Sequence, residues 1–285
     1  MLRECSREEF EKYKDFAYEL ATDITKSGYP TYCDGVKTKE MFISSARESF
    51  ERETEQLLLF ELDGKILGMI HYYWLPEDHY LSTSSFQVST ATEQALSEFM
   101  AFAKQRFRGY DLFLGFPAEN QDAVKFLAEH GFDCIEDDYN NTAFLEKCGN
   151  FPENPGLIRI DRENYEKFRV LHEQIEGDMY WNSERILNDL DNWVIFVKEE
   201  NGRPQGAVYY IDAKDDWFEI FGIDIDGHQK RPKLFRELVM AALQDAKGRG
   251  GKVMTFFCEK EEEEIVRECG FVCVGNYLCY KIHLN

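Results

Sequence analysis

The stretch "ENQDAVKFLAEHGFDCIED", residues 119–137, has a regular spacing of small, apolar and glycine residues. Asn120 is followed three residues later by Ala123, three later by Phe126, and five later by a Gly-Phe pair at residues 131–132. An ordinary amphipathic helix that ends at a glycine and buries a phenylalanine would have this spacing. The rest of the chain repeats part of the pattern, and that repeat is informative about the fold.

A duplication is the strongest internal signal. "FLAEHGFDCI" (126–135) resembles "IVRECGFVCV" (265–274) at an offset of 139, and the turn "DGKILG" (63–68) returns as "NGRPQG" (201–206) at an offset of 138. An apolar helix stripe also recurs with identical spacing, as Ala95, Leu96, Phe99, Met100 and Ala103 and then as Leu234, Phe235, Leu238, Val239 and Ala242. These features predict two tandem domains, residues 1–150 and 151–285, with the boundary in "CGNFPENPG" (148–156).

Each half has the same predicted order of elements. Helices are expected at 7–20 and 38–53 in the first half, and at 161–175 and 183–190 in the second. A hairpin with Asp-Gly or Asn-Gly at its turn follows in each half. After it come a strand, the amphipathic helix, a short apolar strand, a second helix that ends at Gly-Phe, and closing strands that complete the half. This order predicts an α/β fold in which each half is a mixed, partly parallel sheet flanked by helices.

The element order and the Asn-x-x-Ala-x-x-Phe-Leu-x-x-x-Gly-Phe pattern together resemble the GNAT acetyltransferase superfamily in a tandem arrangement over nearly the whole chain. The resemblance implies acetyl-CoA as co-substrate and transfer of its acetyl group to an amine. It also implies that Asn120 contacts the pantetheine arm or a strand backbone, that Ala123 lets the helix pass close to coenzyme A, and that Phe132 fills the core. Gly131 would end the helix in a left-handed turn.

The family's phosphate-binding loop, which precedes the long helix and is usually rich in glycine, is altered in both halves. In "QVSTATEQ" (87–94) there is no glycine or cation, and the spacing of Thr90 and Glu93 favours a capping box, so we predict a structural loop. In "DGHQKRPKLF" (226–235), Gln229, Lys230 and Arg231 precede a proline suited to the first helical position. These side chains either hold the pyrophosphate or form a solvated turn.

Candidate catalytic residues are few. The family uses a strand carboxylate, often through water, to take the proton of the amine, and "WFEIFGIDID" (217–226) offers Glu219 and Asp224. Strand alternation predicts that Glu219, Phe221 and Ile223 share one face and that Asp224 lies on the other. Glu219 is therefore the candidate base, with a surface carboxylate as the alternative.

The family's usual tyrosine acid, four residues before the Gly of Gly-Phe, is absent from both halves, where Leu127 and Val266 stand. Tyr277 is the substitute by position, with a packed strand tyrosine as the alternative. The cysteines include a C-x3-C spacing at Cys269 and Cys273, but helix-end and strand positions favour core cysteines, so no metal site is predicted.

Composition limits the function further. The net charge of −21 over 285 residues disfavours a nucleic-acid partner, and it either attracts amines or serves solubility. No apolar run is long enough for a membrane helix and the first residues lack a secretory signal, which predicts a cytoplasmic protein without a membrane partner. The sequence does not reveal the oligomeric state.

Three hypotheses remain open from the sequence. In the first, the C-terminal half binds acetyl-CoA and transfers the acetyl group to an amine of a small molecule or peptide. In the second, both halves have lost catalysis and the protein is a binding or scaffold module. In the third, the N-terminal half is the active one and uses Asn120 with the backbone N–H groups of residues 89–92.

Overall fold

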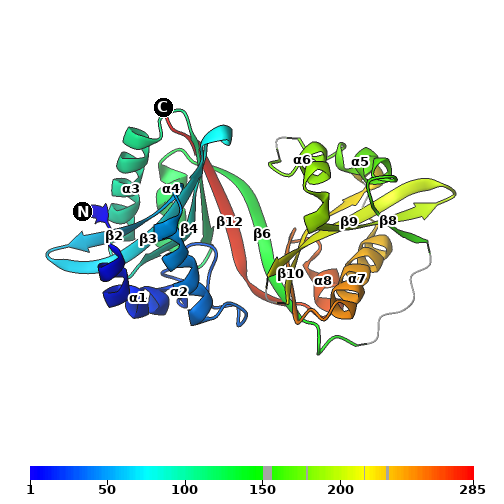
Figure 1. The fold of residues 1–285 in the computed structure, drawn as a ribbon, viewed down its shortest axis with the longest axis horizontal. Coiled ribbons are helices and arrows are strands. Elements are labelled where there is room, and N and C mark those ends of the chain that lie inside the picture. Colours follow the sequence, from blue (N-terminus) through cyan, green and yellow to red (C-terminus); the bar gives the residue numbers. More distant parts are fainter. Residues whose placement is uncertain (150–155, 178, 215, 229–230) are drawn as a thin grey trace. The chain divides into compact units, whose positions relative to one another are not determined.

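The computed structural model describes residues 1–149, 156–177, 179–214, 216–228 and 231–285 (Figure 1). It contains two compact units. Unit 1 comprises residues 1–138 and 274–285, and unit 2 comprises residues 139–273. Within the described residues, no helix is both long and apolar enough to cross a membrane.

Unit 1 is a sheet with helices on both faces. Its elements are β1 (Leu2–Glu4), α1 (Arg7–Ala21), α2 (Lys39–Glu48), β2 (Glu55–Leu62), β3 (Lys65–Leu75), β4 (Tyr80–Val88), α3 (Thr92–Arg106), β5 (Asp111–Pro117), α4 (Gln121–Glu129) and the first part of β6 (Asp133–Phe144). The strands lie in the order β1-β2-β3-β4-β5-β12-β6. β4 and β5 are parallel, whereas β3 and β4 and also β5 and β12 are antiparallel, so the predicted mixed sheet is confirmed.

Unit 2 repeats this plan. Its elements are the end of β6, β7 (Leu157–Arg159), α5 (Glu166–His172), α6 (Ser183–Asn188), β8 (Trp193–Glu200), β9 (Arg203–Lys214), β10 (Trp217–Ile225), α7 (Pro232–Gly248), β11 (Val253–Cys258), α8 (Glu263–Glu268) and the start of β12 (Val272–His283). β10 and β11 are parallel. Figure 1 shows α5 and α6 against one face of this sheet and α7 and α8 against the other.

The repeated sequence features occupy equivalent places in the two units. Both predicted helix stripes are buried, on α3 in unit 1 and on α7 in unit 2. Both hairpin turns have two residues in the left-handed region, with φ of 51° and 74° at residues 63–64 and of 53° and 73° at residues 201–202, as type I′ turns require. Gly131 and Gly270 have φ of 78° and 102°, and the phenylalanine after each is buried, as the resemblance implied.

The closing strands are exchanged between the halves. β12, the last strand of the chain, pairs with β5 in unit 1, whereas residues 139–144 of β6 pair with β11 in unit 2. The expectation that each half closes its own sheet is therefore wrong. Unit 1 combines two separate segments of the chain, residues 1–138 and 274–285. The predicted domains, 1–150 and 151–285, are each a single continuous segment. Each sheet is thus completed by a strand whose first residues belong to the other half.

Candidate functional site

The parallel strands β4 and β5 of unit 1 separate after a short stretch of pairing, and another segment of the chain lies between them. We call the space between such separating strands the fork, with its closed end where the pairing stops. β4 and β5 pair only over residues 80–82 and 111–113. Beyond that point a segment from the α1–α2 loop, residues 26–29, lies between the two strands, with a bridge from Ser27 to Gln87. The segment belongs to a 17-residue connection, residues 22–38.

Backbone hydrogen bonds attach this segment to both strands. On β4, Phe86 O accepts from Gly28 N at 2.7 Å and Val88 N donates to Lys26 O at 3.0 Å. On β5, Gly115 O accepts from Tyr29 N at 2.8 Å. A Cβ on Gly28 would lie 3.0 Å from Gly115 O and 3.2 Å from Phe86 Cβ, so the chain has little room between the strands. The edges of the fork in unit 1 are thus already hydrogen-bonded.

The side chain of Asn120 forms a hydrogen bond with the same segment. Its Nδ2 donates to Ser27 O at 3.1 Å, and its Oδ1 accepts from Ala123 N at 3.4 Å as the N-cap of α4. The side chain is 2% exposed. Both polar atoms of Asn120 therefore bond to the protein's own backbone, in the α1–α2 loop and in α4.

The loop before α3 differs from its prediction. The helix begins at Thr92 with Ala91 as N-cap at φ 60°, and no side chain caps it, so the predicted capping box of Thr90 and Glu93 is wrong. The left-handed conformation costs an alanine about 1 kcal/mol or more. The loop therefore has a backbone turn that glycine would adopt more easily, although it contains no glycine. Ser89 N, one of the N–H groups in the third hypothesis, donates to Leu67 O at 2.8 Å.

The corresponding fork in unit 2 has no such segment among the described residues. β10 and β11 pair over residues 217–220 and 253–256. The connection between α5 and α6 has only ten residues, 173–182, seven fewer than its counterpart in unit 1. The shorter loop accounts for the absence of such a segment among the described residues.

Strand register identifies the edge groups of the unit 2 fork. Gly68 lies opposite Val88, and Gly206 of the repeated turn lies opposite Ile225, so Val88 and Ile225 are equivalent. The groups that correspond to Phe86 O and Val88 N are then Ile223 O and Ile225 N. No hydrogen bond from another described residue across the fork reaches them. They remain available to a ligand with amide groups.

The N-terminus of α7 lies after the open end of this fork. Pro232 is the first helical residue and Arg231 the N-cap, with no side-chain cap, so backbone N–H groups of the first turn are not bonded by a capping side chain. The Arg231 guanidinium bonds Gln205 Oε1 at 2.8 Å and lies 3.5 Å from Glu200 Oε2. Gln229 and Lys230, predicted with Arg231 to hold phosphates, lie outside the described residues.

A β-bulge decides which side chains of β10 face the α5 side. The register with β9 shifts between Ile220 and Gly222. Before the bulge Phe218 and Ile220 pack with α7, and after it Ile223 and Ile225 do so. Asp224 consequently lies on the α5 side, where it contacts His172, while Ile223 faces away. The predicted alternation, with Ile223 beside Glu219 and Asp224 opposite, is wrong because the bulge adds one residue.

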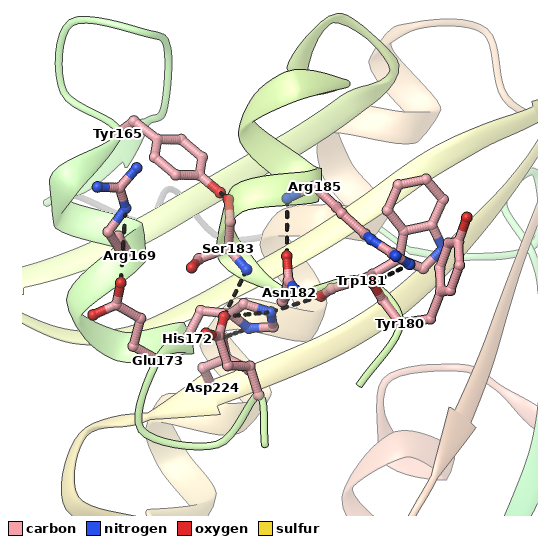
Figure 2. A network of polar contacts seen from close by, with 11 residues as sticks. Tyr165, Arg169, His172, Glu173, Tyr180, Trp181, Asn182, Ser183, Arg185 and Asp224 are labelled. Carbon is pink, nitrogen blue, oxygen red and sulfur yellow. Dashed lines mark hydrogen bonds and ion pairs between the residues drawn. The ribbon is translucent and has the colours of Figure 1, made fainter. Parts of the chain in front are cut away.

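Asp224 and His172 form a buried pair (Figure 2). His172 Nδ1 lies 2.9 Å from Asp224 Oδ2, and His172 Nε2 lies 2.9 Å from the carbonyl oxygen of Trp181. Because a carbonyl can only accept, Nε2 carries a proton and donates it, which leaves one further proton to be shared between Nδ1 and the carboxylate. The two side chains are 0% and 1% exposed.

Burial and pairing act on the pKa values of this pair in opposite ways. For His172, burial alone would lower the pKa, but the hydrogen bond and charge of Asp224 outweigh it and raise the pKa. For Asp224, burial raises the pKa against the opposing effect of His172. Both shifts favour retention of the proton that the pair shares. No local sequence pattern predicts this pair, since the two residues are 52 positions apart.

The two predicted catalytic residues belong to different compact units. Glu219 lies on β10 of unit 2, half-buried, opposite Thr255 of β11 and on the face away from Phe218 and Ile220. Tyr277 lies on β12 in unit 1, opposite Pro117 of β5, and its ring stacks edge-on against Tyr29 at 4.7 Å. Burial raises the pKa of Tyr277 well above its usual value.

No group of three or more His, Cys, Asp or Glu side chains suited to a metal ion occurs among the residues that the structure describes. The eight cysteines form no disulfide, and five of them are buried.

Comparison with solved structures shows the fold of the GNAT N-acetyltransferases in its tandem form. A GCN5-related N-acetyltransferase from Sphaerobacter thermophilus matches 100% of this chain and 96% of its own, with a TM-score of 0.68 and 12% identity. A tandem GNAT protein from the clavulanic acid biosynthesis pathway matches 100% and 98%, with a TM-score of 0.59 and 11% identity. A GCN5-related N-acetyltransferase from Kribbella flavida matches 84% and 93%, with a TM-score of 0.55 and 16% identity.

No family model and no curated protein matches the sequence. At these identities the likeness concerns the fold, and the tandem GNAT fold expected from the repeat and the helix motif is confirmed.

Proposed function

We propose that the protein is an acetyl-CoA-dependent N-acetyltransferase in which unit 2 binds acetyl-CoA and unit 1 supports it. The observation that carries this proposal is the contrast between the forks. In unit 1, residues 26–29 take the backbone bonds of both strands, whereas in unit 2 Ile223 O and Ile225 N have no described partner across the fork. The GNAT fold supports acetyl transfer as the reaction class by analogy alone.

Unit 2 has groups that suit each part of acetyl-CoA. The pyrophosphate would lie at the N-terminus of α7, where N–H groups and the helix dipole favour an anion, and Arg231 would contact it. The pantetheine arm would follow the edge of β10, with its amides bonded to the free groups at 223 and 225. The five residues of strand from Phe221 to Ile225 span about 13 Å.

The proposed chemistry is direct attack on the thioester. The amine nitrogen bonds to the acetyl carbon, the carbon–sulfur bond breaks, and coenzyme A leaves as a thiolate that takes up a proton. Glu219 is the proposed base that removes the proton of the ammonium, directly or through water. Tyr277, the predicted acid, belongs to unit 1, so the proposal assigns no proton donor to the thiolate. The acceptor is an amine of a small molecule or peptide, and the charge of −21 favours such a cation.

Isothermal titration with acetyl-CoA tests the assignment to unit 2. One acetyl-CoA should bind per chain, because among the described residues a chain segment fills the fork of unit 1 and none fills that of unit 2. Two equivalent sites per chain, or no binding at millimolar concentration, would contradict the proposal. Binding without release of coenzyme A across a broad panel of amines would favour the alternative, a catalytically inactive tandem GNAT protein that acts as a binding module.

Arg231→Ala tests the phosphate contact. In the free protein Arg231 pairs with Glu200, whose side chain is 51% exposed, and such a pair contributes only about 0–1 kcal/mol, so Arg231 can exchange it for a phosphate at small cost. A charge-assisted hydrogen bond contributes roughly 1.5–3 kcal/mol, so the variant should bind acetyl-CoA about ten- to a hundredfold more weakly. The affinity of the wild type should also fall with added salt.

Arg236→Ala is the matched control, because Arg236 lies one turn further along α7 and pairs with Glu268 on the surface. It should leave the affinity unchanged. Equal effects of the two substitutions on the affinity for acetyl-CoA would show that Arg231 acts only through the net charge of the protein, which both substitutions change by the same amount. Unchanged affinity and salt response in Arg231→Ala would show that the loop is a solvated turn.

A further inference from the structure

An exposed aromatic residue lies at the closed end of the unit 2 fork. The parallel pairing of β10 and β11 ends at Ile220 and Phe256, and Phe221 is the next residue of β10. Phe221 is also the residue that the β9 register skips, so it belongs to the bulge, and it is 39% exposed. An arm that enters the fork from its open end must stop where the strands join, which is beside Phe221.

Phe221 begins a continuous row of aromatic rings. The centroid of its ring lies 5.0 Å from that of Trp193. The ring centroids of Trp193 and Trp181 are 5.3 Å apart, as are those of Trp181 and Tyr180. All three contacts are edge-to-face, with interplanar angles of 74°, 70° and 88°. The row ends on the α5–α6 loop at Tyr180, which is 40% exposed, and Met179 beside it is 50% exposed. We call Tyr180, Trp181, Trp193 and Phe221 the aromatic row.

The α5–α6 loop carries Tyr180 and Trp181, and hydrogen bonds through His172 connect it to β10, which carries Phe221. His172 donates to the carbonyl of Trp181 at 2.9 Å and pairs with Asp224 of β10 (Figure 2). Ser183 N, at the far end of the loop, donates to Glu176 Oε2 at 2.6 Å. A surface loop held by a buried pair loses little conformational freedom when a ligand binds, so the row is preorganised.

A polar group within the row lacks a partner. The indole N–H of Trp193 is enclosed, and no described residue accepts its proton, although Trp193 is only 5% exposed. Buried donors are normally satisfied, by the protein or by a bound molecule. This observation is independent of the exposure of Phe221, and no described residue supplies the missing acceptor atom.

The charge around the row selects the kind of ligand. Glu219 precedes Phe221 by two residues on the same face of β10, and Glu176 lies on the loop, 4.0 Å from His172 Nε2. Aromatic faces bind cations, and Tyr180 already does so, since the Arg185 guanidinium lies 4.1 Å above its ring. Apolar rings beside carboxylates suit a molecule with an ammonium group on an apolar body.

We propose that the aromatic row is the acceptor site of unit 2 and that it takes a primary amine carried on an aromatic or extended apolar group, with the ammonium toward Glu219. The assignment as acceptor site depends on the proposed function, because it assumes a thioester at the closed end of the fork. The apolar body lies against Phe221 and Tyr180. The amine then forms the amide bond while the thioester carbon–sulfur bond breaks, and Glu219 takes the proton released by the nitrogen.

The test compares amines of similar size but different polarity, namely 2-phenylethylamine, hexylamine and 2-(2-aminoethoxy)ethanol. Burial of one ring or alkyl chain should favour the first two over the third about ten- to a hundredfold in kcat/KM. Phe221→Ala should remove most of that preference. Because Phe221 is exposed, the variant should fold. Val170→Ala, at an exposed apolar residue of α5, is the matched control and should leave the preference unchanged.

A binding measurement separates this proposal from the proposed function. Three of the four tryptophans belong to unit 2, so amine binding without acetyl-CoA should change the tryptophan fluorescence in a saturable way that Phe221→Ala weakens about tenfold. If acetyl-CoA does not bind but the amine does so in this way, the proposed function fails and the aromatic row stands. Equal turnover of polar and apolar amines, or an unchanged preference in Phe221→Ala, would overturn the aromatic row while acetyl transfer stands.

Discussion

Asn120→Ala distinguishes a structural asparagine from a cofactor contact. The substitution removes the N-cap of α4, which contributes about 1 kcal/mol, and leaves the carbonyl of Ser27 without its donor, at a cost of about 1–3 kcal/mol for a buried group. We therefore expect unit 1 to lose about 2–4 kcal/mol of stability. For a unit of this size that corresponds to a fall in Tm of roughly 5–15 °C.

Hydrogen exchange followed by mass spectrometry can locate this loss. In Asn120→Ala, amides of α4 and of the segment 26–29 should both exchange faster. Asn120→Asp keeps a capping oxygen but has no donor for Ser27, so only the segment should exchange faster. Titration with acetyl-CoA should give the wild-type affinity for both variants, because Asn120 belongs to the filled fork of unit 1.

One result would refute this reasoning. If Asn120→Ala weakened acetyl-CoA binding tenfold or more while the stability and the exchange of residues 26–29 stayed as in the wild type, Asn120 would be a cofactor contact. The third hypothesis, an active N-terminal half, would then replace the proposed one.

Two further predictions concern protonation and thiol reactivity. Because pairing raises the pKa of His172 and burial raises that of Asp224, folding takes up protons. The stability from this pair is then fully present below about pH 6.5 and is lost as the pH rises through the folded pKa. Urea unfolding at pH 6 and pH 9 should show a larger fall in stability for the wild type than for His172→Gln/Asp224→Asn, and parallel falls would contradict the prediction. Native protein should react rapidly with Ellman's reagent at the exposed thiols, Cys33, Cys134 and Cys273. Burial raises the pKa to about 12 at Cys5 and Cys279 and to about 11 at Cys269, so these and the other buried thiols should react only in denaturant. Rapid reaction of all eight thiols in the native protein would show that the reagent reaches the buried cysteines, which would contradict the prediction.

Local and repeated signals determined much of the fold. The Asp-Gly and Asn-Gly turns, the two helix stripes and the two Gly-Phe pairs all have the structure that they predict, because each depends on residues close together in sequence. Their repetition at nearly one offset was enough to predict a tandem α/β fold. Asn120 was also found from its spacing in the helix motif, although its bonding partner, Ser27, was not.

Tertiary structure alone decided how the halves are completed and which fork is open. The exchange of β6 and β12 could not be predicted, because the choice of partner strand depends on contacts between residues more than a hundred positions apart. The filling of the unit 1 fork depends on where a 17-residue loop folds back, over a separation of about sixty residues to β4 and about ninety to β5. A single bulge in β10 turned Asp224 toward His172 and left Phe221 exposed at the fork, because one added residue reverses the faces of every residue that follows it.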